Sequence, residues 1–226
     1  MSMQRHLPAL VLICSAMTAP GAFADSSCAP VAKALNAGLA QPRIHAAIDS
    51  PLNADAIKMG MKPTLIHSIV IDQVQYSNAI RPTFSRTALE SKEMRMLATD
   101  LGPFMVEEGC KPGGSDKVAG RDSIVFTAKG DLGRGEIRFK LWIDKATGLP
   151  LRAVSDEPEV DVDAVFNALD KKNGRPSVEV KEKPNGKRQI ATHAYLFGDA
   201  VKPPGVNGTL DAGALTSLQA VLKGAQ

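Results

Sequence analysis

The chain has 226 residues and a net charge of +3, with 27 Lys and Arg side chains against 24 Asp and Glu. Charges this balanced and interspersed disfavour a nucleic-acid partner or a strongly anionic surface. Aromatic residues make up only 4% of the chain, which also disfavours a stacking platform for single-stranded nucleic acid.

Residues 1–24 have the features of a secretory signal peptide. Arg5 opens a short basic region, residues 7–17 are apolar, and the Ala-Phe-Ala that ends the segment matches the small-x-small cleavage rule. Cleavage is therefore expected before Asp25, with export to the periplasm and a single mature domain over residues 25–226. The apolar run is too short to span a bilayer.

The three cysteines fall into two groups. Cys14 lies within the signal, and its acylation is a rival interpretation, although Ile13 is not the small residue that normally precedes an acylated cysteine. Cys28 and Cys110 remain after cleavage, and a lone pair in an exported chain is most simply a disulfide. A redox or metal pair is the less favoured alternative, because there is no CxxC motif and no histidine near either cysteine in sequence.

Helix and strand patterns alternate after the signal. Apolar residues at four-residue steps from Val31 to Leu39 predict a helix, with Ser26 or Ser27 as its cap. The strands that follow, the second of them long or bulged, are expected over residues 43–49, 64–76 and 83–87.

A second helix is expected over residues 90–101. Thr87 and Glu90 have capping-box spacing, and Met94 and Leu97 fall on one side of the predicted helix. Methionine suits irregular core gaps and adaptable apolar cavities alike. The Gly-rich and Pro-containing segment over residues 110–120 is expected to be a loop.

The stretch from Glu136 to Arg152 is the clearest strand-turn-strand pattern in the chain. A strand over residues 122–129 precedes it, and a turn is expected from Asp144 to Gly148, so the three strands predict an antiparallel meander. Period-two alternation places one set of side chains of the middle strand on a buried face, namely Ile137, Phe139, Leu141 and Ile143.

The C-terminal third predicts more mixed structure. Residues 162–172 have helical spacing, although a strand is an alternative there. A hairpin with an Asn-Gly turn is expected between residues 177–182 and 189–197. Leucines at helical spacing predict a terminal amphipathic helix over residues 210–222.

No catalytic or metal-binding motif stands in the mature chain. GxSxG, HExxH, P-loop and GxGxxG patterns are absent. His45, His67 and His193 are each isolated within a strand pattern, which favours a structural role. The carboxylates over residues 156–163 lack the glycine and the final glutamate of a calcium loop, so they are interpreted as a solvated face.

Several segments together resemble LolA-like periplasmic proteins. They are Val118-Ala119-Gly120, Lys140-Leu141-Trp142-Ile143-Asp144, Thr147-Gly148-Leu149-Pro150-Leu151-Arg152, and the late Phe197-Gly198-Asp199 followed by Pro203-Pro204. The family includes outer-membrane lipoprotein carriers, LolB-type acceptors and sensor domains of sigma-factor regulators. The resemblance is specific over about residues 118–152 and loose elsewhere.

The resemblance implies an α+β fold. Its antiparallel sheet would curl into an unclosed barrel, with helices covering the concave face and a cavity for acyl chains between them. The family has no catalytic residues to transfer. The buried arginine that holds the lid helix of the carriers has no match here, and the expected disulfide and the acidic segment over residues 156–172 depart from the pattern.

The sequence therefore predicts an exported periplasmic protein that is not an enzyme and needs no cofactor. Its partner would be a hydrophobic small molecule, a lipid or a lipoprotein acyl group, with an envelope protein as a further candidate and no nucleic acid. The ligand-binding residues would be Ile137, Phe139, Leu141, Ile143, Met94 and Leu97. An envelope-stress sensor or protein-interaction domain on the same fold is the first alternative, and a secreted hydrolase with an unrecognised site is the second.

Overall fold

The computed structural model describes residues 26–50, 65–79, 83–106, 109–131, 136–158 and 188–224. The α-helices in these ranges are α1 (Ala29–Leu39), α3 (Lys92–Ala98) and α5 (Ala212–Lys223), with short 3-10 turns at Ser26–Cys28, Gly102–Phe104 and Gly198–Ala200. The strands are β1 (Arg43–Asp49), β2 (Ile66–Ile71), β3 (Val74–Ser77), β4 (Ser85–Ala88), β5 (Lys111–Val118), β6 (Arg121–Asp131), β7 (Glu136–Asp144), β8 (Pro150–Pro158) and β9 (Arg188–Phe197).

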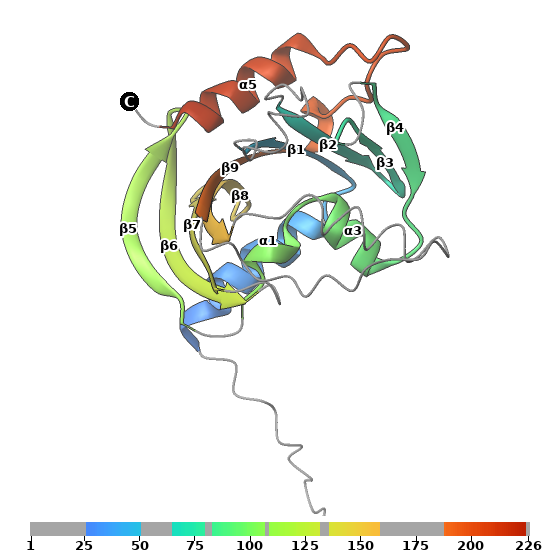
Figure 1. Cartoon of the computed structure of the whole chain (residues 1–226). Helices are drawn as coiled ribbons and strands as arrows, with labels where there is room; N and C mark the ends of the chain where they lie inside the picture. The colour runs from blue at the N-terminus through green and yellow to red at the C-terminus, as the bar shows by residue number, and fades with distance from the viewer. Residues whose placement is uncertain are drawn as a thin grey trace, which may run out of the picture.

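All described strands belong to one antiparallel sheet. Its order is β4-β3-β2-β1-β9-β8-β7-β6-β5, so β4 and β5 are its two edges and the sheet does not close. Figure 1 shows the sheet curling around α1 and α3, while α5 crosses its outside. This confirms the predicted α+β fold with an antiparallel, unclosed, curled sheet.

The inner face of the sheet packs against α1. Val31 and Leu35 of α1 are buried in one cluster with Phe139 and Leu141 of β7 and Tyr195 of β9. Alternation along β7 and four-residue spacing along α1 supply the two apolar surfaces that this contact removes from water. The predicted buried face of the central strand is therefore confirmed as core.

The outer face of the sheet carries its own helix. Leu218 and Val221 of α5 are buried with Val125, Trp142 and Ala194, which project from the opposite side of β6, β7 and β9. Helices thus cover both faces of the sheet in part, an arrangement that the resemblance alone did not imply.

The disulfide links the N-terminal helix to an edge strand. The Sγ atoms of Cys28 and Cys110 lie 1.99 Å apart and the two Cα atoms 5.0 Å apart. Cys28 directly precedes α1 and Cys110 directly precedes β5. This is the pairing that the cysteine count predicts.

One predicted strand and one predicted loop are wrong. Residues 64–76 do not form one long strand, because Asp72 adopts a φ of +55° and the chain folds back into the β2–β3 hairpin. Residues 110–120 are not a loop, since most of them form β5. Pro112 is tolerated there because β5 is an edge strand, and its pairing with β6 shifts register between Pro112 and Ser115.

Both predicted N-terminal caps are also wrong. The Ser91 side chain accepts a hydrogen bond from the Met94 N–H at 3.1 Å, so α3 begins one turn later than the Thr87 capping box predicts. The N-cap of α1 is Cys28, which makes no side-chain capping bond. The predicted signal peptide, the helix over residues 162–172 and the strand over residues 177–182 lie outside the described residues.

Candidate functional site

A groove of about 580 Å³ crosses the outer face of β5 to β9, and we call it the outer-face groove. Its volume falls within the range of about 300–1,000 Å³ that is usual for small-molecule sites. The described residues that line it are Gly109, Lys111, Thr127, Ala128, Lys129, Arg138, Phe139, Lys140, Val154, Asp156 and Ile190.

Strand register determines which side chains meet in the groove. Lys111 lies opposite Thr127, Thr127 opposite Lys140, and Lys140 opposite Val154, so these four form one row across β5 to β8. Partners in an antiparallel sheet project from the same face. The row therefore lies on the side away from α1.

A second row lies two residues further along each strand. Lys129 is paired with Arg138, Arg138 with Asp156, and Asp156 with Ile190. Ile190 is 61% exposed, which leaves a large apolar side chain in solvent at one end of the groove. The groove therefore combines apolar surface at β8 and β9 with cations at β5 to β7.

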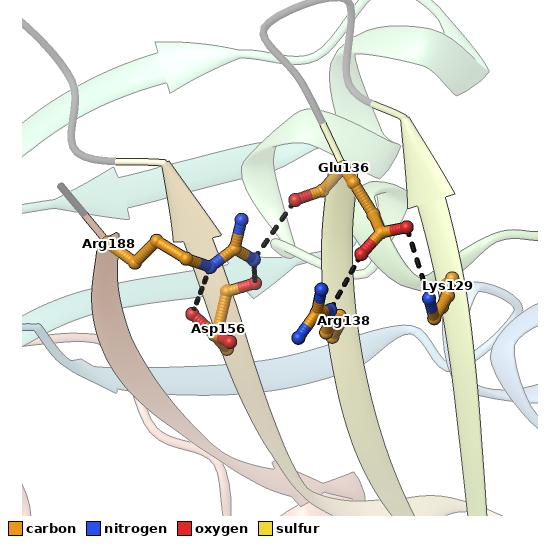
Figure 2. A network of polar contacts seen from close by, with 5 residues as sticks. All are labelled: Lys129, Glu136, Arg138, Asp156 and Arg188. Atoms are coloured by element: carbon orange, nitrogen blue, oxygen red, sulfur yellow. Dashed lines mark hydrogen bonds and ion pairs between the residues drawn. The ribbon is translucent and has the colours of Figure 1, made fainter. Parts of the chain in front are cut away.

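Charged side chains at the second row form a network (Figure 2). Glu136 accepts from Arg138 Nε at 2.6 Å and from Lys129 Nζ at 3.2 Å. These hydrogen bonds, Arg138 first, lower the pKa of Glu136, and the Glu136 carboxylate raises the pKa of Arg138. Arg188 reaches across from β9, with its Nε 2.7 Å from Asp156 Oδ1 and its Nη2 donating to the carbonyls of Glu136 and Asp156.

The structure separates the predicted ligand-binding residues into two groups. The four on the strand are all buried: Ile137, Phe139, Leu141 and Ile143. Met94 and Leu97 are 37% and 74% exposed on α3, which packs on β2, whereas the helix that packs on β7 is α1. Of the six, only Phe139 lines the outer-face groove.

A buried polar cluster lies on the inner face, and sequence reasoning missed it. The Ser155 Oγ is 3.3 Å from His193 Nε2, and His193 Nδ1 is 2.5 Å from Asp100 Oδ2. Tyr195 donates to the Asp100 carbonyl at 3.0 Å, and the Phe104 ring meets His193 edge-on. Burial, and then the Asp100 charge, raise the pKa of Tyr195.

Ser155 and His193 of the cluster are enclosed within the core, whereas the Asp100 side chain is only partly buried. Ser155 is only 1% exposed and His193 is buried. Asp100 adopts a φ of +54°, a left-handed conformation that Asp tolerates better than most residues. The cluster therefore fixes the segment after α3 to β8 and β9, and no local sequence pattern joins its three members.

The other two histidines form a second buried pair. His45 Nε2 lies 3.0 Å from His67 Nδ1, on the outer face where β1 and β2 meet. Burial lowers the pKa of both rings, and the neighbouring His67 lowers that of His45 further, to about 3. Across the residues that the structure describes, no three His, Cys, Asp or Glu side chains are grouped to hold a metal ion.

The chain matches no protein-family model, and no curated protein matches its sequence. Among solved structures it is similar to LprF from Mycobacterium bovis, at 12% identity over 80% of this chain and 97% of that one, with a TM-score of 0.43. Lipoprotein LppX from Mycobacterium tuberculosis is similar at 12% identity over 78% of this chain and 97% of that one, with a TM-score of 0.42. A LolA superfamily protein from Nitrosomonas europaea matches at 10% identity over 74% of this chain and 90% of that one, with a TM-score of 0.26.

The architecture has the features that the sequence resemblance implied. An open antiparallel sheet curled around α1 and α3 is what the sequence resemblance implied, and the structure shows it directly. None of the described helices has the length and apolar character needed to cross a membrane.

Proposed function

We propose that this chain is an exported periplasmic protein, without enzymatic activity, that binds the apolar chain of a lipid or lipoprotein in the outer-face groove. The observation that carries the proposal is the groove itself, an open volume of about 580 Å³ that extends from Thr127 to Ile190. Binding would remove Val154 and Ile190 from water, and each Å² of apolar surface removed contributes about 25 cal/mol.

In this proposal the ligand binds the outer-face groove, and not the cavity between sheet and helices that the resemblance implied. Ile137, Leu141 and Ile143 already pack in the core, and filling their space with ligand would require displacing α1. The groove needs no such displacement, because Thr127, Lys140, Val154 and Ile190 line it from the face away from α1. This makes the outer face the better candidate for reversible binding.

Two matched substitutions test the location of the site. Ile190→Asp places a carboxylate on the apolar end of the groove, and displacement of a fluorescent fatty-acid probe should show affinity reduced about tenfold or more. Leu97→Asp makes the same change on α3, where the side chain is even more exposed, and should bind the probe like the wild type. Loss of binding in Leu97→Asp alone would favour the predicted helix-side cavity.

Export is proposed from the sequence pattern and has its own test. Periplasmic extraction followed by N-terminal sequencing should recover a chain beginning at Asp25. An uncleaved chain in the cytosol would overturn this part of the proposal. A protein partner that copurifies in equal amount, without bound lipid, would favour the sensor or protein-interaction alternative.

A hydrolase is the second candidate, and the Ser155–His193–Asp100 cluster is what favours it. A serine hydroxyl beside an imidazole whose other nitrogen faces a carboxylate is the arrangement that activates a nucleophile. Its burial argues for a structural role, because substrate reaches Ser155 only if the segment after α3 moves. A fluorophosphonate probe should label the hydrolase but not Ser155→Ala, whereas the binding proposal predicts no labelling of either.

A further inference from the structure

We infer that the ligand is a single-chain amphiphile with an anionic head group, and that Lys111, Thr127 and Lys140 hold this head group. The inference rests on the proposed function, since it names the ligand class of the same groove. We call these three residues the anion seat.

Register brings the three side chains to one place. Lys111 and Lys140 lie on either side of Thr127, each directly opposite it in the sheet. Cβ atoms of such pairs are about 4.5–5.5 Å apart. Two flexible lysine side chains therefore start on either side of one hydroxyl, and all three groups are within reach to donate hydrogen bonds to an anion above Thr127.

The other cations of the groove already have partners. Lys129 and Arg138 share Glu136, and Arg188, which does not line the groove itself, is bound to the lining residue Asp156. Within the described ranges, neither Lys111 nor Lys140 forms an ion pair. Counted over the described residues, the groove thus carries positive charge beyond what their carboxylates compensate, and this charge is concentrated at the seat.

One further carboxylate, that of Asp116, interacts electrostatically with Lys140 of the anion seat. The pKa of Asp116 is lowered by the hydrogen bond from the Trp142 indole, by the Lys117 N–H and by the charge of Lys140. Its Oδ2 is 2.8 Å from Trp142 Nε1, so it is held by the ring rather than by Lys140. Lys140 instead places its Nζ 4.5 Å from the centre of the same ring.

The apolar end of the groove gives the ligand a direction. Ile190 on β9 lies three strand spacings, about 14 Å, across the sheet from Thr127 on β6 and two residues, about 7 Å, further along, so a head group above Thr127 is about 16 Å from it. Val154 on β8 lies between them in the row of the seat. An extended chain attached to the head group therefore covers Val154 and Ile190, which a compact anion would leave exposed.

Fatty-acid carboxylates and the phosphate of lysophosphatidic acid share the chemistry that the seat requires. The test measures binding of both to the mature chain by calorimetry, beside two ligands without net negative charge, the methyl ester of the same fatty acid and lysophosphatidylcholine. The two anions should bind about tenfold or more tightly than the two ligands without net negative charge. The tighter of the two anions identifies the head group.

Variants separate the seat from the groove. Lys140→Gln and Lys111→Gln should each weaken anion binding several-fold, and together remove the preference over the ester. Lys117→Gln is the matched control, because Lys117 is an exposed lysine of β5 that pairs with Asp122 and does not line the groove. Equal affinity of wild type for acid and ester, or no effect of the seat variants, would overturn the inference while leaving the proposed function intact.

Trp142 supplies an independent readout because it is the single tryptophan of the chain. A fatty acid brominated near its carboxyl end should quench Trp142 fluorescence more than one brominated at its far end. The reverse order would overturn the proposed direction. If no amphiphile binds, the proposed function fails as well, and binding only to anionic vesicles would replace both proposals with membrane docking.

Discussion

At the scale of single residues, burial keeps the His45–His67 pair uncharged. His45 Nε2 lies 3.0 Å from His67 Nδ1. The pKa of His45 is lowered from 6.5 to about 3, first by burial and then by the neighbouring His67. In the unfolded chain each ring binds a proton below pH 6.5, whereas the folded chain does not. The pair therefore links folding to pH.

The free energy of unfolding should fall as the solution is acidified. The contribution of His45 is fully present above pH 6.5 and is lost as the pH falls toward 3. Between about pH 7 and about pH 4.5 the loss from this one group is about 2–3 kcal/mol. Urea unfolding of wild type and His45→Gln at both values tests this, and the same pH dependence in both proteins would contradict it.

Gly148 is the second residue with a specific conformational role. It ends the β7–β8 turn that the sequence predicts from Asp144 to Gly148, its φ of +70° is left-handed, and no atom lies near enough to obstruct an added Cβ. The turn also depends on Asp144, which accepts hydrogen bonds from the Ala146 N–H and the Thr147 hydroxyl. Backbone conformation alone therefore makes a substitution at Gly148 unfavourable.

Gly148→Val should destabilise the protein by about 1–2 kcal/mol, because a β-branched residue fits a left-handed conformation poorly. Gly148→Asn is the matched control and should lose much less, since Asn tolerates that region. Thermal unfolding of the two variants gives the comparison. Equal melting temperatures would show that φ at this position does not limit stability.

At the scale of elements, the disulfide ties α1 to β5 across 82 residues of sequence. Loss of a native disulfide of this kind costs about 2–5 kcal/mol. Cys28→Ser and Cys110→Ser should each show that loss in chemical unfolding, and the double variant should lose little more, because one bond is removed in every case. Additive losses, or two free thiols in protein taken from the periplasm, would contradict the assignment.

Local patterns predicted the elements whose signals are themselves local. Alternation identified β7 and its buried face, and the Asp-to-Gly turn identified the link to β8. The pattern over residues 64–76 failed because β-branched residues continue through Asp72, where only the backbone conformation shows the turn. Pro112 contributed to the prediction of a loop over residues 110–120. A proline is incompatible with a central strand but is tolerated in an edge strand such as β5.

The candidate site was less predictable than the fold, because it depends on strand order and register. Met94 and Leu97 share a helix face, but sequence does not state which strand a helix covers. Nothing local brings Ser155, His193 and Asp100 together either, since they lie on two strands and a turn. Lys111 lies in a segment that the sequence predicts to be a loop. Its position in the groove follows only from the pairing of β5 with β6.

At the scale of the whole molecule, the curled sheet has two differently used faces. The inner face packs against α1 and α3 and is fixed by the polar cluster at His193. The outer face is covered by α5 at one part and left open at the outer-face groove. We propose that ligand binds this open part and not the space under the helices.

Photocrosslinking tests that claim most directly. A long-chain fatty acid with a diazirine in its chain would be irradiated on the mature protein, and the modified residues identified by peptide mass spectrometry. The groove account predicts adducts on β6 to β9, at Thr127, Val154 or Ile190, that an excess of unlabelled fatty acid removes. Competed adducts on α1 or α3, such as Met94 or Leu97, would contradict it.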